Sequence, residues 1–163
     1  MTRSPMTQLE DYFRQKVSQE GFDLFAVFAR FEYAMKKGGF RRHASPDAAW
    51  QSFAGALPGD FYATMQAAPE ARVYFDQPPA YLVRDAFDGV EWSKTPVVVK
   101  DASSLFEAIK VARNNLFHGD KAHDNDRDTK LMAAALFVLN SAFAATERDP
   151  KFQRFVSEME FGL

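Results

Sequence analysis

The stretch SLFEAIKVARNNLFHG, residues 104–119, predicts a long helix and sets the fold class of the chain. Ser104 and Glu107 have the spacing of a capping box, in which two side chains accept hydrogen bonds from backbone N–H groups at the start of a helix. Apolar residues then recur at steps of three and four, as on the buried face of a helix. The residues on that face are Leu105, Ile109, Ala112 and Leu116. Gly119 predicts the end of the helix, because glycine readily adopts the left-handed conformation that follows a last turn.

The last turn of this predicted helix brings a cation, an amide and an imidazole together. Asn114 and His118 are four residues apart, so they lie over each other on one face. Arg113 lies about 100° round the axis from Asn114 and about 7.5 Å along the axis from His118. A guanidinium can donate two parallel hydrogen bonds to a phosphate, and an imidazole exchanges a proton near neutral pH. The three residues are therefore candidates for holding and cleaving a phosphodiester.

The pattern Arg-Asn-x3-His-Gly at 113–119, followed by a second long helix, resembles the signature of the HEPN superfamily. The resemblance covers about residues 7–37 and 104–148, and it implies an all-α, up-and-down bundle of four main helices. Many HEPN members are metal-independent ribonucleases in which two motifs from two domains form a composite cleft at a dimer interface. We therefore expect a homodimer without a cofactor that cleaves RNA with Arg113, Asn114 and His118.

In the expected reaction the RNA supplies its own nucleophile, the 2′-hydroxyl group. His118, protonated beside the partially negative last carbonyls of the helix, would act as general acid towards the leaving 5′ oxygen. Asn114 would orient the imidazole, and Arg113 would stabilise the extra charge of the pentacoordinate phosphate. The expected products are a cyclic 2′,3′-phosphate and a free 5′-hydroxyl.

Two other interpretations fit the same residues. HEPN domains also serve as non-catalytic modules that bind a nucleotide or a partner protein, and some are paired with nucleotidyltransferases. Alternatively, the motif is structural, because cations such as Arg113 and His118 suit the negative end of a helix dipole. For an active enzyme, the resemblance implies a toxin or defence component, with transfer RNA as a candidate substrate and an antitoxin as a candidate partner.

The other helices are predicted from caps and apolar spacing in the same way. The first is expected to bury Leu9, Phe13 and Val17 and to stop at Gly21. The second is expected to stop at Gly38-Gly39. Together the predicted helices cover about residues 7–19, 22–37, 104–118, 124–148 and 151–159.

Residues 40–100 are expected to form an irregular insertion in a single domain that spans residues 1–163, with its helical core at about 7–37 and 104–160. Pro46 and Pro58 each precede a short helical pattern. Strand-like runs at 72–75, 81–83 and 97–99 suggest a small β-hairpin among several prolines.

Composition limits the class of protein. The chain has no cysteine, which excludes disulfides and Cys-ligated metal. Residues 1–5 lack an apolar signal region and the apolar run Leu131–Leu139 is short, so we expect a cytoplasmic protein that is not inserted in a membrane. The net charge of −2 argues against a general nucleic-acid coat protein and leaves room for local phosphate contacts.

A basic segment follows the second predicted helix and is a weaker candidate for RNA or phosphate binding. Its cations are Lys36, Lys37, Arg41 and Arg42, with His43 beside them. A solvated helix end explains Lys36 and Lys37 equally well, because cations favour the last turn. On the second helix itself, Arg30, Glu32 and Tyr33 share the polar side and are candidates to line a cleft opposite the motif.

Acidic residues and histidines crowd the segment after the motif, but they do not predict a metal site. Asp124, Asp126 and Asp128 imitate the first ligands of a calcium loop. The imitation fails because Thr129 stands where such a loop needs glycine and Ala135 where it needs glutamate. The run is instead expected to favour the start of the next helix through the helix dipole.

Overall fold

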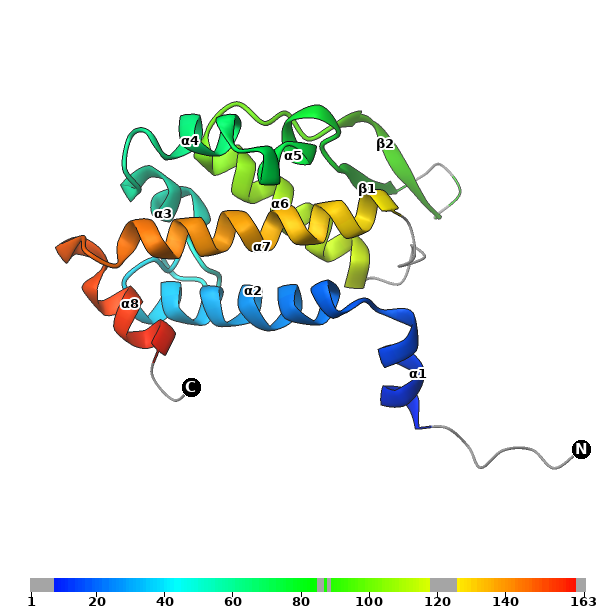
Figure 1. Cartoon of the computed structure of the whole chain (residues 1–163), viewed down its shortest axis with the longest axis horizontal. Coiled ribbons are helices and arrows are strands. Elements are labelled where there is room, and N and C mark those ends of the chain that lie inside the picture. The colour runs from blue at the N-terminus through cyan, green and yellow to red at the C-terminus, as the bar shows by residue number, and fades with distance from the viewer. Residues whose placement is uncertain (1–7, 85–86, 88, 118–125, 161–163) are drawn as a thin grey trace, which may run out of the picture.

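The computed structural model describes residues 8–84, 87, 89–117 and 126–160. Within these residues the chain forms eight α-helices, two short 3-10 turns and one two-stranded sheet (Figure 1). The prediction of a mainly α-helical fold is thus confirmed.

The helices and strands follow one another in a simple order along the chain. They are α1 (Leu9–Lys16), α2 (Gln19–Lys37), α3 (Trp50–Ala56), α4 (Phe61–Ala67), α5 (Val73–Asp76), β1 (Ala80–Arg84), β2 (Val90–Pro96), α6 (Ala102–Phe117), α7 (Asp126–Thr146) and α8 (Gln153–Glu160). The 3-10 turns are Pro69–Ala71, before α5, and Pro150–Phe152, before α8.

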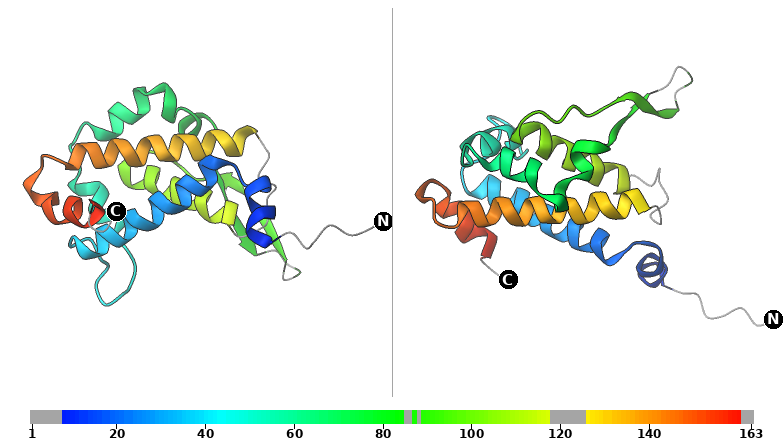
Figure 2. Two further views of the ribbon diagram at one scale, coloured as in Figure 1. Left: turned by 60° about the horizontal axis from the view of Figure 1, so that its bottom comes forward. Right: turned by 45° about the horizontal axis from the view of Figure 1, so that its top comes forward.

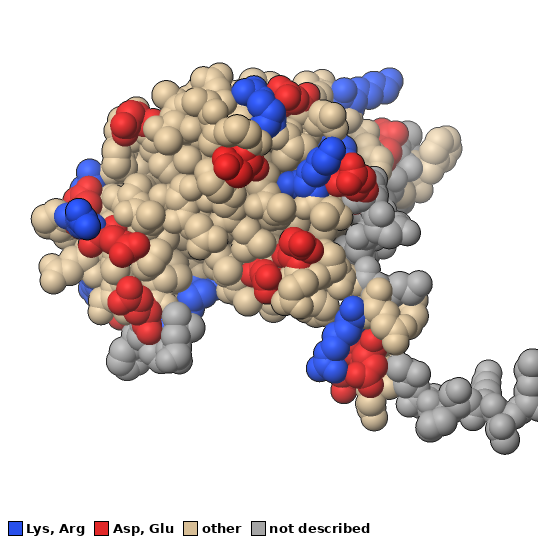
Figure 3. Space-filling view, in the orientation of Figure 1, with Lys and Arg blue, Asp and Glu red and all other residues tan. Residues whose placement is uncertain are grey.

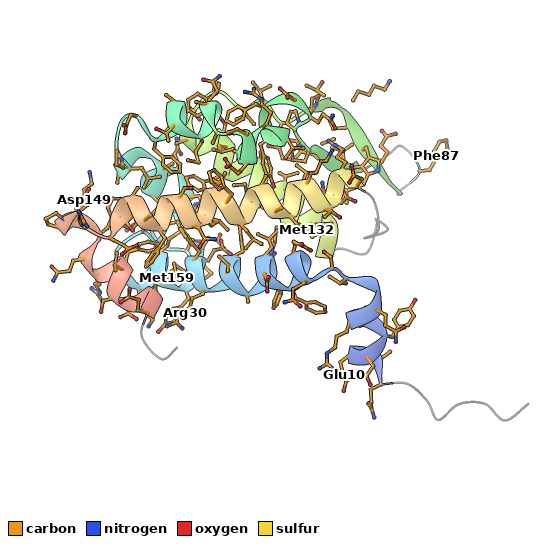
Figure 4. All side chains as sticks on the ribbon, in the orientation of Figure 1. Glu10, Arg30, Phe87, Met132, Asp149 and Met159 are labelled. Carbon is orange, nitrogen blue, oxygen red and sulfur yellow. The ribbon has the colours of Figure 1, made fainter. Side chains whose placement is uncertain are left out.

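Helix α7 lies at the centre of the fold, with α2, α4, α5, α6 and α8 in contact with it (Figure 1). Its buried residues include Leu131, Met132, Val138 and Leu139. Figure 4 labels Met132, whose sulfur lies 3.9 Å from the Ser18 hydroxyl at the start of α2. By length and composition alone α7 could also cross a membrane. The central helix of a bundle meets the same test, so these two properties carry little weight.

Helix α6 begins at Ala102, two residues before the predicted capping box. The Asp101 carboxylate accepts from the Ser104 N–H at 2.8 Å, and the Ser104 hydroxyl accepts from the Asp101 N–H at 3.0 Å. The reciprocal pair is therefore Asp101 with Ser104, and the predicted pairing of Ser104 with Glu107 is wrong. The hydrogen bonds from the Ser104 backbone and hydroxyl hold the pKa of Asp101 below its ordinary value.

The N-terminal region corrects two predictions. Gly21 lies inside α2 rather than after α1, and its N–H donates to the side chain of Ser18, the residue that caps α2. A side chain at Gly21 would start 2.7 Å from a methyl of Val17, so glycine is required there by close packing. Leu9 and Phe13, predicted to be buried, are 72% and 49% exposed. Helix α1 extends away from the other described helices (Figure 2).

The segment 40–100 is more helical than predicted and contributes to the core. The helices predicted after Pro46 and Pro58 are present as α3 and α4, although α3 begins only at Trp50. Phe53, Phe61 and Tyr74 from this segment are buried against the long helices. The segment is therefore an integral part of the packing rather than an irregular excursion from it.

One of the three predicted strand runs is correct. Residues 81–83 lie in β1, which pairs with β2 in an antiparallel hairpin. Residues 73–75 lie in helix α5 instead, and residues 97–99 follow β2. Tertiary contacts favour a helix over a strand here, because the helix buries Tyr74 fully and its hydroxyl donates to the Leu131 carbonyl of α7 at 2.9 Å. The same burial raises the pKa of Tyr74 far above its ordinary value.

An aromatic cluster fills the space between α2, α3, α6 and α8. The Phe53 ring is at its centre and meets the rings of Phe31, Phe40, Trp50, Phe106, Phe152 and Phe155 at centroid distances of 5.0–6.2 Å. Most of these contacts are edge-to-face or tilted, the geometries that aromatic rings prefer. Six of the 17 phenylalanines lie in this cluster and hold these helices together.

Candidate phosphate-binding site

The motif lies at the last turn of α6. Arg113 and Asn114 are half-buried there, whereas His118 and Gly119 lie outside the described residues. The predicted helix is present up to Phe117, so the backbone geometry expected for Arg113 and Asn114 is confirmed. The expected stacking of Asn114 with His118 stays a prediction.

The guanidinium of Arg113 is held by two neighbours. Its central carbon lies 5.2 Å from the centroid of the Phe28 ring on α2, and one terminal nitrogen donates to the Asn114 side-chain oxygen at 2.9 Å. A cation above an aromatic face is attracted by the ring quadrupole, and the attraction grows when water is partly excluded. The contacts therefore fix the direction of a charged group that would otherwise sample many rotamers.

The contact between Arg113 and Asn114 also sets the orientation of the amide. Arginine has only donors, so the amide oxygen of Asn114 must face it and the amide nitrogen must face away. The pair carries N–H groups on both side chains and one positive charge. Such a group of donors suits an anion with several oxygens, such as a phosphate.

Phe28 belongs to a chain of contacts that sequence reasoning did not connect with the motif. Its ring stacks on Trp50 of α3 with centroids 5.2 Å apart, and the Trp50 indole N–H donates to the Glu32 carboxylate at 2.9 Å. Phe28 and Arg113 are 85 positions apart in the sequence. Which buried ring would lie under Arg113 depends on how α6 packs across α2, and spacing cannot give that.

The predicted grouping of Arg30, Glu32 and Tyr33 is not found. Arg30 donates to the carbonyls of Glu158 and Met159 at the end of α8, and Figure 4 shows Arg30 and Met159 side by side. The Tyr33 hydroxyl also reaches Glu158, at 3.4 Å. Glu32 turns instead to Trp50, so the three residues serve two different interfaces and do not line one cleft.

Asn115 has a structural role within the motif run. It is 5% exposed, and its side-chain nitrogen donates to the Ala80 carbonyl at 2.9 Å, which ties the start of β1 to α6. A signal for this was present in the sequence, because Asn115 continues the buried positions Ala108, Val111 and Ala112 at helical spacing. An amide in an apolar series indicates a buried hydrogen bond.

The four basic candidates lie at the other end of α2. Lys36 and Lys37 are exposed in its last turn, and Arg41 and Arg42 are exposed in the loop that follows. Eight residues separate Phe28, which lies under Arg113, from Lys36, or roughly 12 Å along the helix axis. The basic segment and the motif are therefore distinct parts of the surface.

Within the described residues, neither a metal-ligand cluster nor the apolar groove beside α2 involves Arg113 or Asn114. Within the described residues, no group of three or more His, Asp or Glu side chains could hold a metal ion, while Asp120, His123 and Asp124 lie outside them. An apolar groove of about 320 Å³ runs between α2, α7 and α8, lined by Val27, Phe31 and Leu139 among others. Neither Arg113 nor Asn114 is among its lining residues.

Comparison of the chain with protein-family models, curated protein sequences and solved structures finds no match. The resemblance to the HEPN signature therefore stays a prediction from residues 113–119. What bears on function is the chemistry of Arg113, Asn114 and the residues that position them.

Proposed function

We propose that this protein is a metal-independent endoribonuclease of the HEPN type, acting as a homodimer whose two motifs face each other. The observation that carries the proposal is the fixed position of Arg113, held by the Phe28 ring and by Asn114 in the turn that leads to His118. A guanidinium that is already oriented can receive a phosphate with little further ordering. Preorganised donors of this kind stabilise charge that develops in a transition state.

The protein and the RNA supply every group that the reaction needs. The 2′-oxygen forms a bond to phosphorus while the bond from phosphorus to the 5′ oxygen breaks. One His118 accepts the proton of the 2′-hydroxyl, and His118 of the second protomer gives a proton to the leaving 5′ oxygen. Arg113 and the amide N–H groups of Asn114 receive the negative charge of the pentacoordinate phosphate.

The test is cleavage of total RNA and transfer RNA by the purified full chain in EDTA. We expect fragments with cyclic 2′,3′-phosphate and 5′-hydroxyl ends, and loss of cleavage in His118→Ala. Arg113→Lys keeps the charge but loses the planar fork of donors, so kcat should fall by roughly 10²-fold or more. Circular dichroism and thermal unfolding of both variants should match the wild type, so that a loss of cleavage reports chemistry rather than folding.

Asn114→Asp provides a matched control for the role of the donors. The carboxylate keeps an oxygen for Arg113 and preserves the shape of the side chain, but it replaces the N–H donors with negative charge. We expect this variant to fold normally and to lose more activity than Asn114→Ala. Equal activity in the two variants would contradict a phosphate contact by Asn114.

Three outcomes would overturn the proposal. Cleavage that persists in His118→Ala would come from another nuclease in the preparation. No cleavage by a folded dimer would favour the non-catalytic alternative, a HEPN-like module that binds a nucleotide or a partner protein. Analytical ultracentrifugation decides the state of assembly, and a monomer would contradict the composite site.

A further inference from the structure

A rigid loop follows α2 and presents cations on a fixed frame. After Gly39, which has a φ of 99°, the Phe40 N–H donates to the Met35 carbonyl and the chain reverses. Residues 40–49 then form a narrow antiparallel loop, because the Ala49 N–H donates to the Phe40 carbonyl and the Arg42 N–H to the Asp47 carbonyl. Figure 2 shows this loop extending from the body at the end of α2.

The base of the loop is anchored in the aromatic cluster. The Phe40 ring stacks on Phe152 with centroids 5.3 Å apart and meets Phe53 edge-on at 5.5 Å. Gly38 lies so close to α8 that a side chain there would start 2.8 Å from the Phe155 backbone. The loop is therefore held against α2 and α8, and charges on it keep their place relative to the helices.

Positive charge is concentrated on this frame. The basic segment consists of Lys36, Lys37, Arg41, Arg42 and His43, all of them exposed. No acidic residue occurs from Tyr33 to Pro46. Asp47 lies 3.9 Å from Arg42, but both side chains are exposed and such a pair is weak. By contrast, the face drawn in Figure 3 shows basic and acidic side chains interspersed.

Helix capping does not explain the whole segment. The dipole of α2 accounts for Lys36 and Lys37 in its last turn. Arg41 and Arg42 lie beyond the helix, where the dipole no longer acts, and their exposed side chains contribute little to packing. Both side chains are therefore accessible to an external anion.

The loop and the motif are connected through the rings of Trp50 and Phe28. Residue 49 leads directly into Trp50, whose ring stacks on Phe28, and Phe28 carries the Arg113 guanidinium on its face. Along α2, Phe28 and Lys36 are roughly 12 Å apart, and a stacked strand covers a distance on this scale in several nucleotides at about 3.4 Å each.

We propose that the basic segment binds the phosphate backbone of the RNA on one side of the cleaved bond, so that the substrate is a single strand extending several nucleotides past Arg113. This inference rests on the proposed function for the identity of the polymer. Lys and Arg on an exposed loop read charge and not sequence, so contacts here give affinity and register rather than base preference.

The test measures binding separately from cleavage. A uniformly 2′-O-methylated single-stranded RNA cannot attack its own phosphates, so its binding to the full chain can be followed by fluorescence anisotropy across salt concentrations. Arg41→Gln/Arg42→Gln is compared with Lys94→Gln/Lys100→Gln, which removes the same charge from exposed positions on β2 and before α6. We expect the first pair to weaken binding about tenfold and to lower the salt slope by about 0.7 for each lost phosphate contact.

The outcomes distinguish this inference from the proposed function. If both double variants lose the same RNA affinity, the effect comes from net charge alone and the inference is overturned. Binding to anionic lipid vesicles that depends on Arg41 and Arg42, without binding to RNA, would also overturn it. If Arg41→Gln/Arg42→Gln cleaves RNA as fast as the wild type when RNA is limiting, the role of the basic segment is refuted and the proposed nuclease activity stands. If RNA binds through the basic segment but is not cleaved, the inference is supported and the proposed nuclease activity is refuted.

Discussion

Aromatic rings have different roles in the cluster around Phe53 and at the last turn of α6, where the motif lies. In the cluster, aromatic rings face other rings and water is excluded. At the motif, one face of the Phe28 ring meets Trp50 while the Arg113 guanidinium lies over the ring at 5.2 Å. This difference shows that the aromatic core extends up to the candidate site, where the Phe28 ring positions the Arg113 guanidinium. Substitutions in the cluster should therefore lower stability, and substitutions at Arg113 should lower activity.

The largest effect is expected at the centre of the cluster. Phe53→Ala removes a fully buried ring and should lower the free energy of unfolding by about 3–5 kcal/mol, since the surrounding rings cannot all collapse into the space. Urea denaturation followed by circular dichroism measures it. Phe87→Ala is the control, because Phe87 is 93% exposed, and it should change stability by no more than about 0.5 kcal/mol. A loss below about 1 kcal/mol at Phe53 would mean that the cluster is loosely packed.

A smaller effect sharpens the boundary between core and site within the motif itself. Asn115→Ala leaves the Ala80 carbonyl without its side-chain donor and should cost about 1–3 kcal/mol of stability. Asn114→Ala, one residue earlier, should cost only about 0.5 kcal/mol because its bond to Arg113 is partly exposed. The same denaturation assay compares the two. If Asn114→Ala proved the more destabilising, the motif would have to be interpreted as a structural element.

The smallest effect lies at the opposite end of α6. Asp101→Ala removes the helix cap and should cost about 1 kcal/mol near neutral pH. The pKa of Asp101 is lowered in the folded state, so the stabilisation from its charge is fully present above the ordinary aspartate pKa of about 3.9. It is lost as the pH falls through the lowered folded-state pKa. The stability difference between wild type and Asp101→Asn should therefore shrink as the pH falls from 6 to about 3.

The contrast between α6 and α1 explains where sequence reasoning succeeded and where it failed. For α6, the predicted buried face of Leu105, Ile109, Ala112 and Leu116 is buried, because other helices cover it on several sides. For α1 the same kind of pattern predicted burial of Leu9 and Phe13, and both are exposed. Periodicity shows which residues share a face of a helix. It does not show whether any other element lies against that face.

Local chemistry determined the helix-forming segments, the stop at Gly38-Gly39 and the presence of an arginine, an asparagine and a histidine within one turn or so of each other. These features depend on residues fewer than about six positions apart, and spacing along a helix fixes their relations. Only the tertiary structure decided that Phe28 lies under Arg113, that Asn115 holds β1, and that residues 40–100 are part of the core. Each of these depends on the packing of segments distant in sequence, and the shape of neighbouring side chains selects that packing from many with a similar apolar pattern.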